Sequence, residues 1–289
     1  MTKTAKFGPG GNSALFAANG YKSSLDAPSW VKNMGLDAYE YECGKGVNAS
    51  LETFAHIGLR AVEMGIDMSI HAPYFISLSG VDPEKRLNSV KYIMQSLAAA
   101  KALGAKVIVV HAGSTAKLDR KVALSYAADT VKRTLEEAAA QGYGDIKIGL
   151  ETMGKINQLG TLDEIIELCR MDSQLVPVVD FGHLYARAHG EDMNTSDKIK
   201  YTFDAISKNL GAEVSENLHC HFSCIEYSNG GEVKHLTFEN GIFGPAPEMF
   251  ANVLAEIGVT PTVICESAGT QDVDAKFLKE CYLKGLMNE

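Results

Sequence analysis

The chain has 289 residues, of which 46% are hydrophobic and 22% are charged, a balance that excludes a disordered or fibrous protein. The net charge of −9 argues against a broad basic surface for nucleic acid, although bound divalent cations can reverse the potential inside one cleft. No apolar run approaches the roughly 20 residues needed to cross a bilayer, and the first residues contain no apolar stretch suited to a signal peptide. We therefore expect a cytoplasmic monomer with no membrane partner, whose six scattered cysteines are reduced thiols.

Short apolar or β-branched segments recur along the chain, and most are followed by a longer segment with helical periodicity. The expected strands are residues 5–9, 37–43, 68–72, 106–113, 146–151, 176–182, 217–223 and 262–267. The expected helices are Ser50–Met64, Glu84–Leu103, Lys117–Gln141, Leu162–Met171, Asp197–Lys208, Pro247–Ile257 and Val273–Leu286. This rhythm predicts an α/β fold, a closed (β/α)8 TIM barrel in which residues 1–289 form a single domain. An open doubly wound sheet is the alternative, and it is disfavoured because no G-x-G-x-x-G follows the first strand.

Histidines and carboxylates stand at the carboxyl ends of six of these strands. They are His71, His111, Glu151, Asp180 with His183, His221 and Glu266. In a parallel barrel these ends converge on one face, where the loops build the active site. His219 lies two residues before His221, so both side chains point to the same side of the strand and His219 can support the site from a deeper layer.

Taken alone, each of these residues has an ordinary structural explanation. His71 could be a hydrogen-bonded rim residue, and Asp180 or Glu151 could cap a helix. Taken together, three carboxylates aimed at one small volume need compensating positive charge, and no Lys or Arg stands at these strand ends. Bound divalent metal is the simplest compensation.

Mixed imidazole and carboxylate ligands suit Zn²⁺, Mn or Fe better than Mg²⁺ or Ca²⁺. Seven or more ligands can hold at least two ions, and Glu151, central in the sequence order, is a natural bridge between them. Such a pair can make hydroxide near neutral pH and clamp a phosphodiester, or it can polarise a sugar carbonyl. This chemistry alone does not separate a phosphodiesterase from a sugar isomerase.

Seven segments, in order, resemble the signatures of endonuclease IV, the zinc-dependent apurinic/apyrimidinic endonucleases of the xylose isomerase-like barrel superfamily. They are HAPYFISL (71–78), VVHAGS (109–114), GLETMG (149–154), VVDFGH (178–183), HFS (221–223), VKHL (233–236) and ICES (264–267). The resemblance implies one Zn²⁺ on His71, His111 and Glu151, and a second on Glu151, Asp180, His221 and Glu266. We assign the catalytic role to Glu151 and Glu266.

The family's third zinc uses a histidine that corresponds to His183, together with an aspartate and a histidine two residues apart. The histidine of this pair is His235, but Val233 occupies the aspartate position. Glu232 is adjacent, and its side chain should point opposite to that of Val233 in an extended segment. We therefore expect two tightly held ions and a weak or empty third position.

Tyr74 and Phe75 stand where the family places residues that wedge into the DNA stack, and simple packing on the barrel rim explains them equally well. The loop after the second strand carries only Lys45 where the family has arginine, and the first strand lacks the family's histidine.

The function that these features favour is a metal-dependent phosphodiesterase that cuts DNA 5′ to abasic sites, with DNA as its partner. A sugar isomerase or epimerase of the same superfamily is the alternative. A metal- or ligand-binding relic without enzymatic activity is a third possibility, because a fold alone does not determine function.

Overall fold

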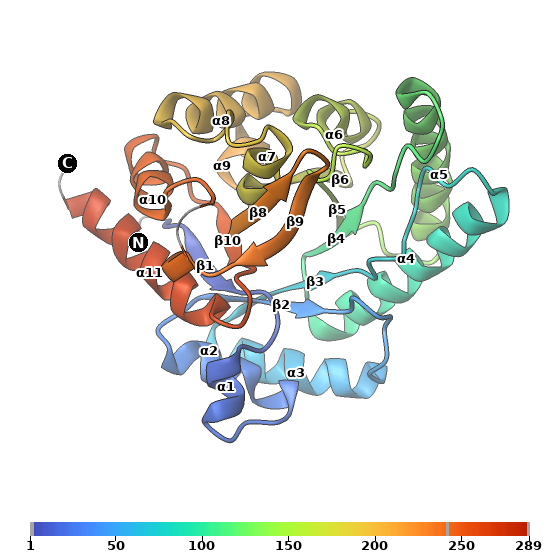
Figure 1. The fold of residues 1–289 in the computed structure, drawn as a ribbon. Helices are drawn as coiled ribbons and strands as arrows, with labels where there is room; N and C mark the ends of the chain where they lie inside the picture. Colours follow the sequence, from blue (N-terminus) through green and yellow to red (C-terminus); the bar gives the residue numbers. More distant parts are fainter. Residues whose placement is uncertain (1–2, 241–242, 288–289) are drawn as a thin grey trace.

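Eight parallel strands form the centre of the computed structural model, which describes residues 3–240 and 243–287. The strands are β1 (Lys6–Pro9), β2 (Ala38–Glu42), β3 (Asp67–His71), β4 (Val107–His111), β5 (Lys147–Glu151), β6 (Leu175–Asp180), β7 (His219–Phe222) and β10 (Thr262–Cys265). Figure 1 shows them in the middle of the molecule, with helices around them. All eight expected strands are present. They follow one another round the sheet in chain order, whereas a doubly wound sheet reverses its order midway. The predicted (β/α)8 barrel is therefore confirmed.

The barrel closes where β1 meets β2. Gly10 forms a parallel bridge with Glu40, and the Gly11 amide donates to the Glu40 carbonyl over 2.9 Å. A Cβ atom on Gly8 would lie only 1.7 Å from the carbonyl oxygen of Ala38. This approach of the two strands therefore requires glycine at position 8.

Helices cover the outside of the barrel. They are α1 (Ala14–Ala18), α2 (Ala27–Asn33), α3 (Leu51–Met64), α4 (Pro83–Leu103), α5 (Arg120–Ala140), α6 (Leu162–Cys169), α7 (Phe181–Arg187), α8 (Ser196–Leu210), α9 (Ala212–Glu216), α10 (Pro247–Glu256) and α11 (Gln271–Met287). The seven predicted helices are confirmed within three residues at each end. The largest difference is at α5, because the Asp119 side chain accepts from the amides of Lys121 and Val122 and so starts the helix at Arg120. The sequence missed α1, α2, α7 and α9, which are too short to show a helical period.

A hairpin that the sequence did not predict follows β7. It consists of β8 (Cys224–Ser228) and β9 (Gly231–Leu236). Its tip lies against the loop after β5, since the Ile156 amide donates to Gly230 O (3.0 Å) and the Glu232 amide to Gly154 O (3.1 Å). A Cβ atom on Gly154 would lie 2.6 Å from Glu232 Cβ, so glycine is needed for this contact.

The hydrophobic core joins the strands to the inner faces of the helices. All six cysteines are free thiols, and five of them are buried, as the sequence predicted. None of the helices in the described part of the chain combines the length and the apolar character that a membrane crossing needs.

Candidate metal centre

A cavity of about 560 Å³ lies at the carboxyl ends of the barrel strands, and its wall contains six of the eight side chains expected to bind metal. The other two, Asp180 and His221, are fully buried. His221 Nδ1 lies 3.4 Å from Glu266 Oε1, and Asp180 Oδ2 lies 3.4 Å from His183 Nδ1. The structure therefore brings all eight together.

The strand register places these residues side by side. His111 at the end of β4 is paired with Glu151 at the end of β5, and Asp180 at the end of β6 is paired with His221 on β7. Because the strands are parallel and in register, polar residues at their last positions form one layer.

Glu151 occupies the middle of this layer, and its two oxygens face different groups of histidines. Its Oε2 atom lies 3.0 Å from His111 Nε2 and 3.3 Å from His71 Nε2. Its Oε1 atom lies 3.2 Å from His221 Nδ1 and 3.3 Å from His183 Nδ1. This two-sided arrangement is what a bridging carboxylate needs.

Three groups of side chains around Glu151 have ligand atoms within 4.8 Å of one another. They are His71, His111 and Glu151; then Glu151, Asp180, His221 and Glu266; and finally His183, Glu232 and His235. The first two match the ligand sets that the resemblance implied. The third differs from the expected set by one residue.

The third group exists because β9 contains a β-bulge. Glu226 pairs with Lys234 and Tyr227 with Glu232, so the register skips Val233. In a regular strand Glu232 and His235 would point to opposite faces, and one extra residue puts them on the same face. Glu232 Oε2 lies 3.4 Å from His183 Nε2, while Val233 is exposed. Glu232 therefore points away from Val233, as expected, but toward His183, and the weak or empty third metal position stays a prediction.

Backbone carbonyls determine which nitrogen two of the histidines offer. His71 Nδ1 lies 2.8 Å from Ala72 O, and His183 Nδ1 lies 2.9 Å from Thr152 O. A carbonyl can only accept, so Nδ1 carries a proton in both rings and Nε2 is the nitrogen available to a metal.

The charges of the cluster shift several pKa values. Burial, together with the negative charges of Glu151 and Asp180, raises the pKa of Glu266 to about 8. Burial alone would raise the pKa of Glu151, but His111, His183 and His221 hold it well below its usual range. Burial lowers the pKa of His71, yet its hydrogen bond to Glu151 and the nearby carboxylates outweigh this effect and raise it to about 10.

A divalent metal fits this set of residues. The contacts of Glu151 with His71, His111 and His221 span 3.0–3.3 Å, close to the roughly 3.3 Å between ligand atoms of a tetrahedral ion with bonds of about 2.0–2.1 Å. In addition, Asp180 Oδ2 is buried without a hydrogen-bond partner. Its other oxygen accepts from the His183 amide and caps α7, so the capping role and a role as ligand are compatible.

The two aromatic residues at the rim differ in position. Tyr74 lines the cavity, its ring stacks on His111 with centroids 5.6 Å apart, and its hydroxyl donates to Glu42 Oε2 over 2.7 Å. Phe75 is half-exposed and packs on Tyr92. Only Tyr74 reaches the cavity in this structure.

The sequence reasoning missed two glutamates and a lysine. Glu40 contacts His219 and His221 from inside the barrel, while Glu42 and Lys155 line the cavity. The two glutamates had a signal, because charged residues at alternate positions of a strand enclosed on both faces point into the barrel. Lys155 comes from the loop after β5, so a cation is available although none stands at the strand ends.

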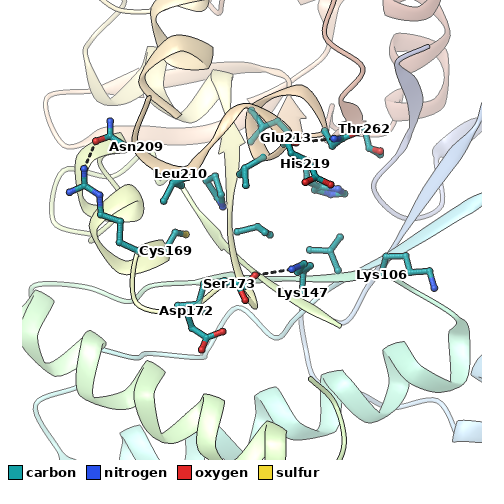
Figure 2. Close-up of a pocket in the computed structure, with 18 of the residues that line it drawn as sticks. Lys106, Lys147, Cys169, Asp172, Ser173, Asn209, Leu210, Glu213, His219 and Thr262 are labelled. Carbon is teal, nitrogen blue, oxygen red and sulfur yellow. Dashed lines mark hydrogen bonds between the residues drawn. The ribbon is translucent and has the colours of Figure 1, made fainter. Parts of the chain in front are cut away.

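A larger cavity, of about 820 Å³, lies at the opposite end of the barrel. Figure 2 shows Lys106, just before β4, and Lys147 and Thr262, the first residues of β5 and β10, together with His219. None of the three ligand groups described above includes a residue that lines this cavity; His219, which is grouped with Glu40 and His221, does line it. Its size therefore does not make it the candidate site.

Comparison with known proteins agrees with this geometry. The family described as xylose isomerase-like TIM barrel matches residues 28–281. An uncharacterized protein of Methanocaldococcus jannaschii is 32% identical over 256 residues, 87% of this chain and 89% of that protein. The chain belongs to the xylose isomerase-like TIM barrel family.

Both endonucleases and an epimerase-like protein are similar to the chain. A probable endonuclease 4 of Acholeplasma laidlawii is 32% identical over 108 residues, 36% of each chain. The structure of endonuclease IV from Thermus thermophilus has a TM-score of 0.69 at 18% identity, covering 98% of this chain and 100% of that one. A D-tagatose 3-epimerase-like protein has a TM-score of 0.71 at 21% identity, covering 98% of both. The resemblance to endonuclease IV is confirmed, and the two structural likenesses show the fold.

Proposed function

We propose that this chain is a metal-dependent phosphodiesterase that cuts DNA 5′ to abasic sites, with Zn²⁺ as its metal. The observation that carries the proposal is the third ligand group. Glu232 completes a set with His183 and His235 beside the two groups that share Glu151. The family resemblance connects three metal positions with endonuclease IV. Because Val233 stands where the family has an aspartate, only two of the three ligand sets were complete in the sequence.

The residues divide the work between holding metal and holding substrate. His71, His111, Glu151, Asp180, His221 and Glu266 would hold two ions, and His183, Glu232 and His235 a third. When bound, such ions supply a hydroxide near neutral pH and neutralise charge on the phosphate oxygens. Lys155, on the cavity wall, is placed to pair with the phosphate of the abasic nucleotide. The half-exposed ring of Tyr74 offers a stacking surface at the entrance.

One observation favours the second candidate, a sugar isomerase or epimerase. Glu42 lines the cavity and is hydrogen-bonded to Tyr74. A carboxylate at this position repels a phosphate but accepts hydrogen bonds from sugar hydroxyls.

One experiment separates the two candidates. Purified, zinc-loaded protein is incubated with a labelled duplex containing a single abasic site, and in parallel with ketohexoses in D₂O. The proposal predicts one cut 5′ to the abasic site, its loss in Glu151→Gln, and no deuterium uptake by the sugars. Deuterium incorporation without DNA cleavage would establish the sugar enzyme instead.

A further inference from the structure

Glu40 is a carboxylate enclosed in the interior of the barrel. It lies in the middle of β2 and is fully buried. Its side-chain contacts within the described residues are with Ser69, His219 and His221. Burying a carboxylate costs several kcal/mol unless it is well paired, so this position calls for an explanation beyond packing.

The two oxygens of Glu40 have different partners. Oε2 accepts from the Ser69 hydroxyl over 2.7 Å and lies 2.9 Å from His219 Nε2. Oε1 lies 2.8 Å from His221 Nε2. Two donors on one oxygen fix the plane of the carboxylate and leave the other oxygen aimed at His221.

These contacts are too short for a further metal site. Glu40, His219 and His221 have potential ligand atoms within 4.8 Å of one another. Ligand atoms of a tetrahedral ion with bonds of about 2.0–2.1 Å lie roughly 3.3 Å apart, whereas the contacts here are 2.8 and 2.9 Å. The His219 contact is a hydrogen bond. The His221 contact has a hydrogen-bonding distance without full hydrogen-bond geometry, and neither Glu40 Oε1 nor His221 Nε2 has another hydrogen-bond partner among the described residues.

His221 is turned so that its two nitrogens face opposite sides. Nδ1 lies 3.2 Å from Glu151 Oε1 and 3.4 Å from Glu266 Oε1, on the metal side. Nε2 faces Glu40. Backbone carbonyls hold the proton of His71 and of His183, but His221 lies within β7, whose neighbouring carbonyls are used in the pairing with β6 and β10. A side chain is therefore needed to do the same for His221.

We propose that Glu40 is a positioning residue for the metal centre. It keeps the proton of His221 on Nε2, holds the ring in place and leaves the Nδ1 lone pair free for an ion. Carboxylates that accept from a ligand histidine in this way typically affect metal affinity about 10- to 100-fold. The inference rests on the proposed metal centre and is independent of the substrate.

The test compares Glu40→Ala and Glu40→Gln with the wild type. Zinc affinity is measured by competition with a chromophoric chelator, and Co²⁺ absorption reports the ligand geometry. We expect about 10- to 100-fold weaker binding for Glu40→Ala with an altered Co²⁺ spectrum. The loss should be smaller for Glu40→Gln, because an amide oxygen can still accept from Nε2–H.

The control is Asp272→Asn. Asp272 is also a fully buried carboxylate, and it accepts from the Ser13 hydroxyl and the Trp30 ring nitrogen. None of its hydrogen-bond partners among the described residues belongs to the metal centre. This variant should lose stability but keep zinc affinity. Equal losses of affinity in Glu40→Ala and Asp272→Asn would reduce the role of Glu40 to stability and overturn the inference.

A second measurement does not depend on the folding of Glu40→Ala. ¹⁵N shifts of the histidines in the zinc-loaded wild type should show His221 protonated at Nε2. Ser69→Ala should also weaken zinc binding, but by less than Glu40→Ala does. A proton on Nδ1, or a wild type that binds no divalent metal, would overturn the inference. If zinc affinity depends on Glu40 but the protein does not cleave abasic DNA, the role of Glu40 is supported and the proposed function is contradicted.

Discussion

The two ends of the barrel differ in chemistry more than in shape. The cavity at the amino ends of the strands is larger, about 820 Å³ against about 560 Å³. Its polar wall mixes cations such as Lys106 and Lys147 with the carboxylates Asp172 and Glu213, and Lys147 donates to Ser173 O. The smaller cavity gathers histidines and buried carboxylates that lack enough cationic partners. The gathered histidines and carboxylates, rather than volume, therefore identify the end at which we propose that metal binds.

The largest effect should come from the carboxylate at the centre of the smaller cavity. Glu151→Gln should lose about 10³-fold or more in kcat/KM, because a neutral amide is a poor bridge between two cations and the barrier rises by several kcal/mol. Cleavage of abasic DNA is measured at matched metal content, with circular dichroism as the check of folding. Wild-type cleavage by this variant would remove Glu151 from its bridging role.

The next effect concerns the third ligand group. Glu232→Ala should weaken the binding of a third zinc ion about 10- to 100-fold, since two imidazoles leave the ion short of the three protein ligands typical of catalytic zinc. From residue spacing alone, Val233→Asp would be expected to strengthen the binding of the third zinc ion. It should leave that binding unchanged, because the side chain at position 233 is exposed. Elemental analysis after dialysis against buffered zinc gives the occupancy. A third ion held by Val233→Asp but not by the wild type would reverse this assignment.

Metal binding should also depend on pH. The pKa of Glu266 is raised to about 8 and that of His71 to about 10. Both groups therefore hold a proton near neutral pH that the unfolded chain binds less tightly. The stability of the metal-free protein should fall as pH rises from 6.5 to 8, and zinc affinity should increase at least about tenfold per pH unit because ions displace these protons. Melting temperatures with and without zinc should thus diverge across this range; parallel curves would contradict the expectation.

A smaller effect is expected for the cation on the cavity wall. Lys155 is exposed at the entrance, so Lys155→Ala should raise KM for abasic DNA roughly fivefold, about 1 kcal/mol, with kcat nearly unchanged. Steady-state kinetics at two salt concentrations measure this. A fall in kcat with constant KM would place Lys155 in the chemical step instead.

The smallest effect should come from the other end of the barrel. Lys147→Ala removes a cation from the larger cavity and should leave kcat/KM within about twofold, as substitutions away from a site usually do. The same cleavage assay applies. A loss comparable to that of Lys155→Ala would show that the amino end takes part in function and would break the distinction between the two cavities.

Much of the candidate site could be predicted because its residues end strands. His111 and Glu151 follow apolar segments whose length and composition predict strands in a barrel, and the fold then brings them together. The hairpin also had a signal, since Asn229 and Gly230 stand between two strand-like segments. The bulge at Val233 had none, because one skipped residue depends on how β8 and β9 pair, and residue spacing does not report that.

Phe75 and Glu40 show two further limits of sequence reasoning. Phe75 is the neighbour of Tyr74 in the chain, but its direction is set by the ring of Tyr92 on α4. Glu40 could have been recognised as pointing inward, yet its partner His221 is 181 positions away in the chain. Only the curvature of the closed sheet brings them within 2.8 Å.

The bulge in β9 has a consequence for how this site can change during evolution. A metal ligand is normally traced by aligning equivalent positions, and here such an alignment pairs the family's aspartate with Val233 and suggests that the ligand was lost. A single local insertion in the pairing of two strands instead exchanges an aspartate two residues before His235 for a glutamate three residues before it. On the proposed assignment, the ligand has therefore moved by one position along the chain while the third ligand group stays complete.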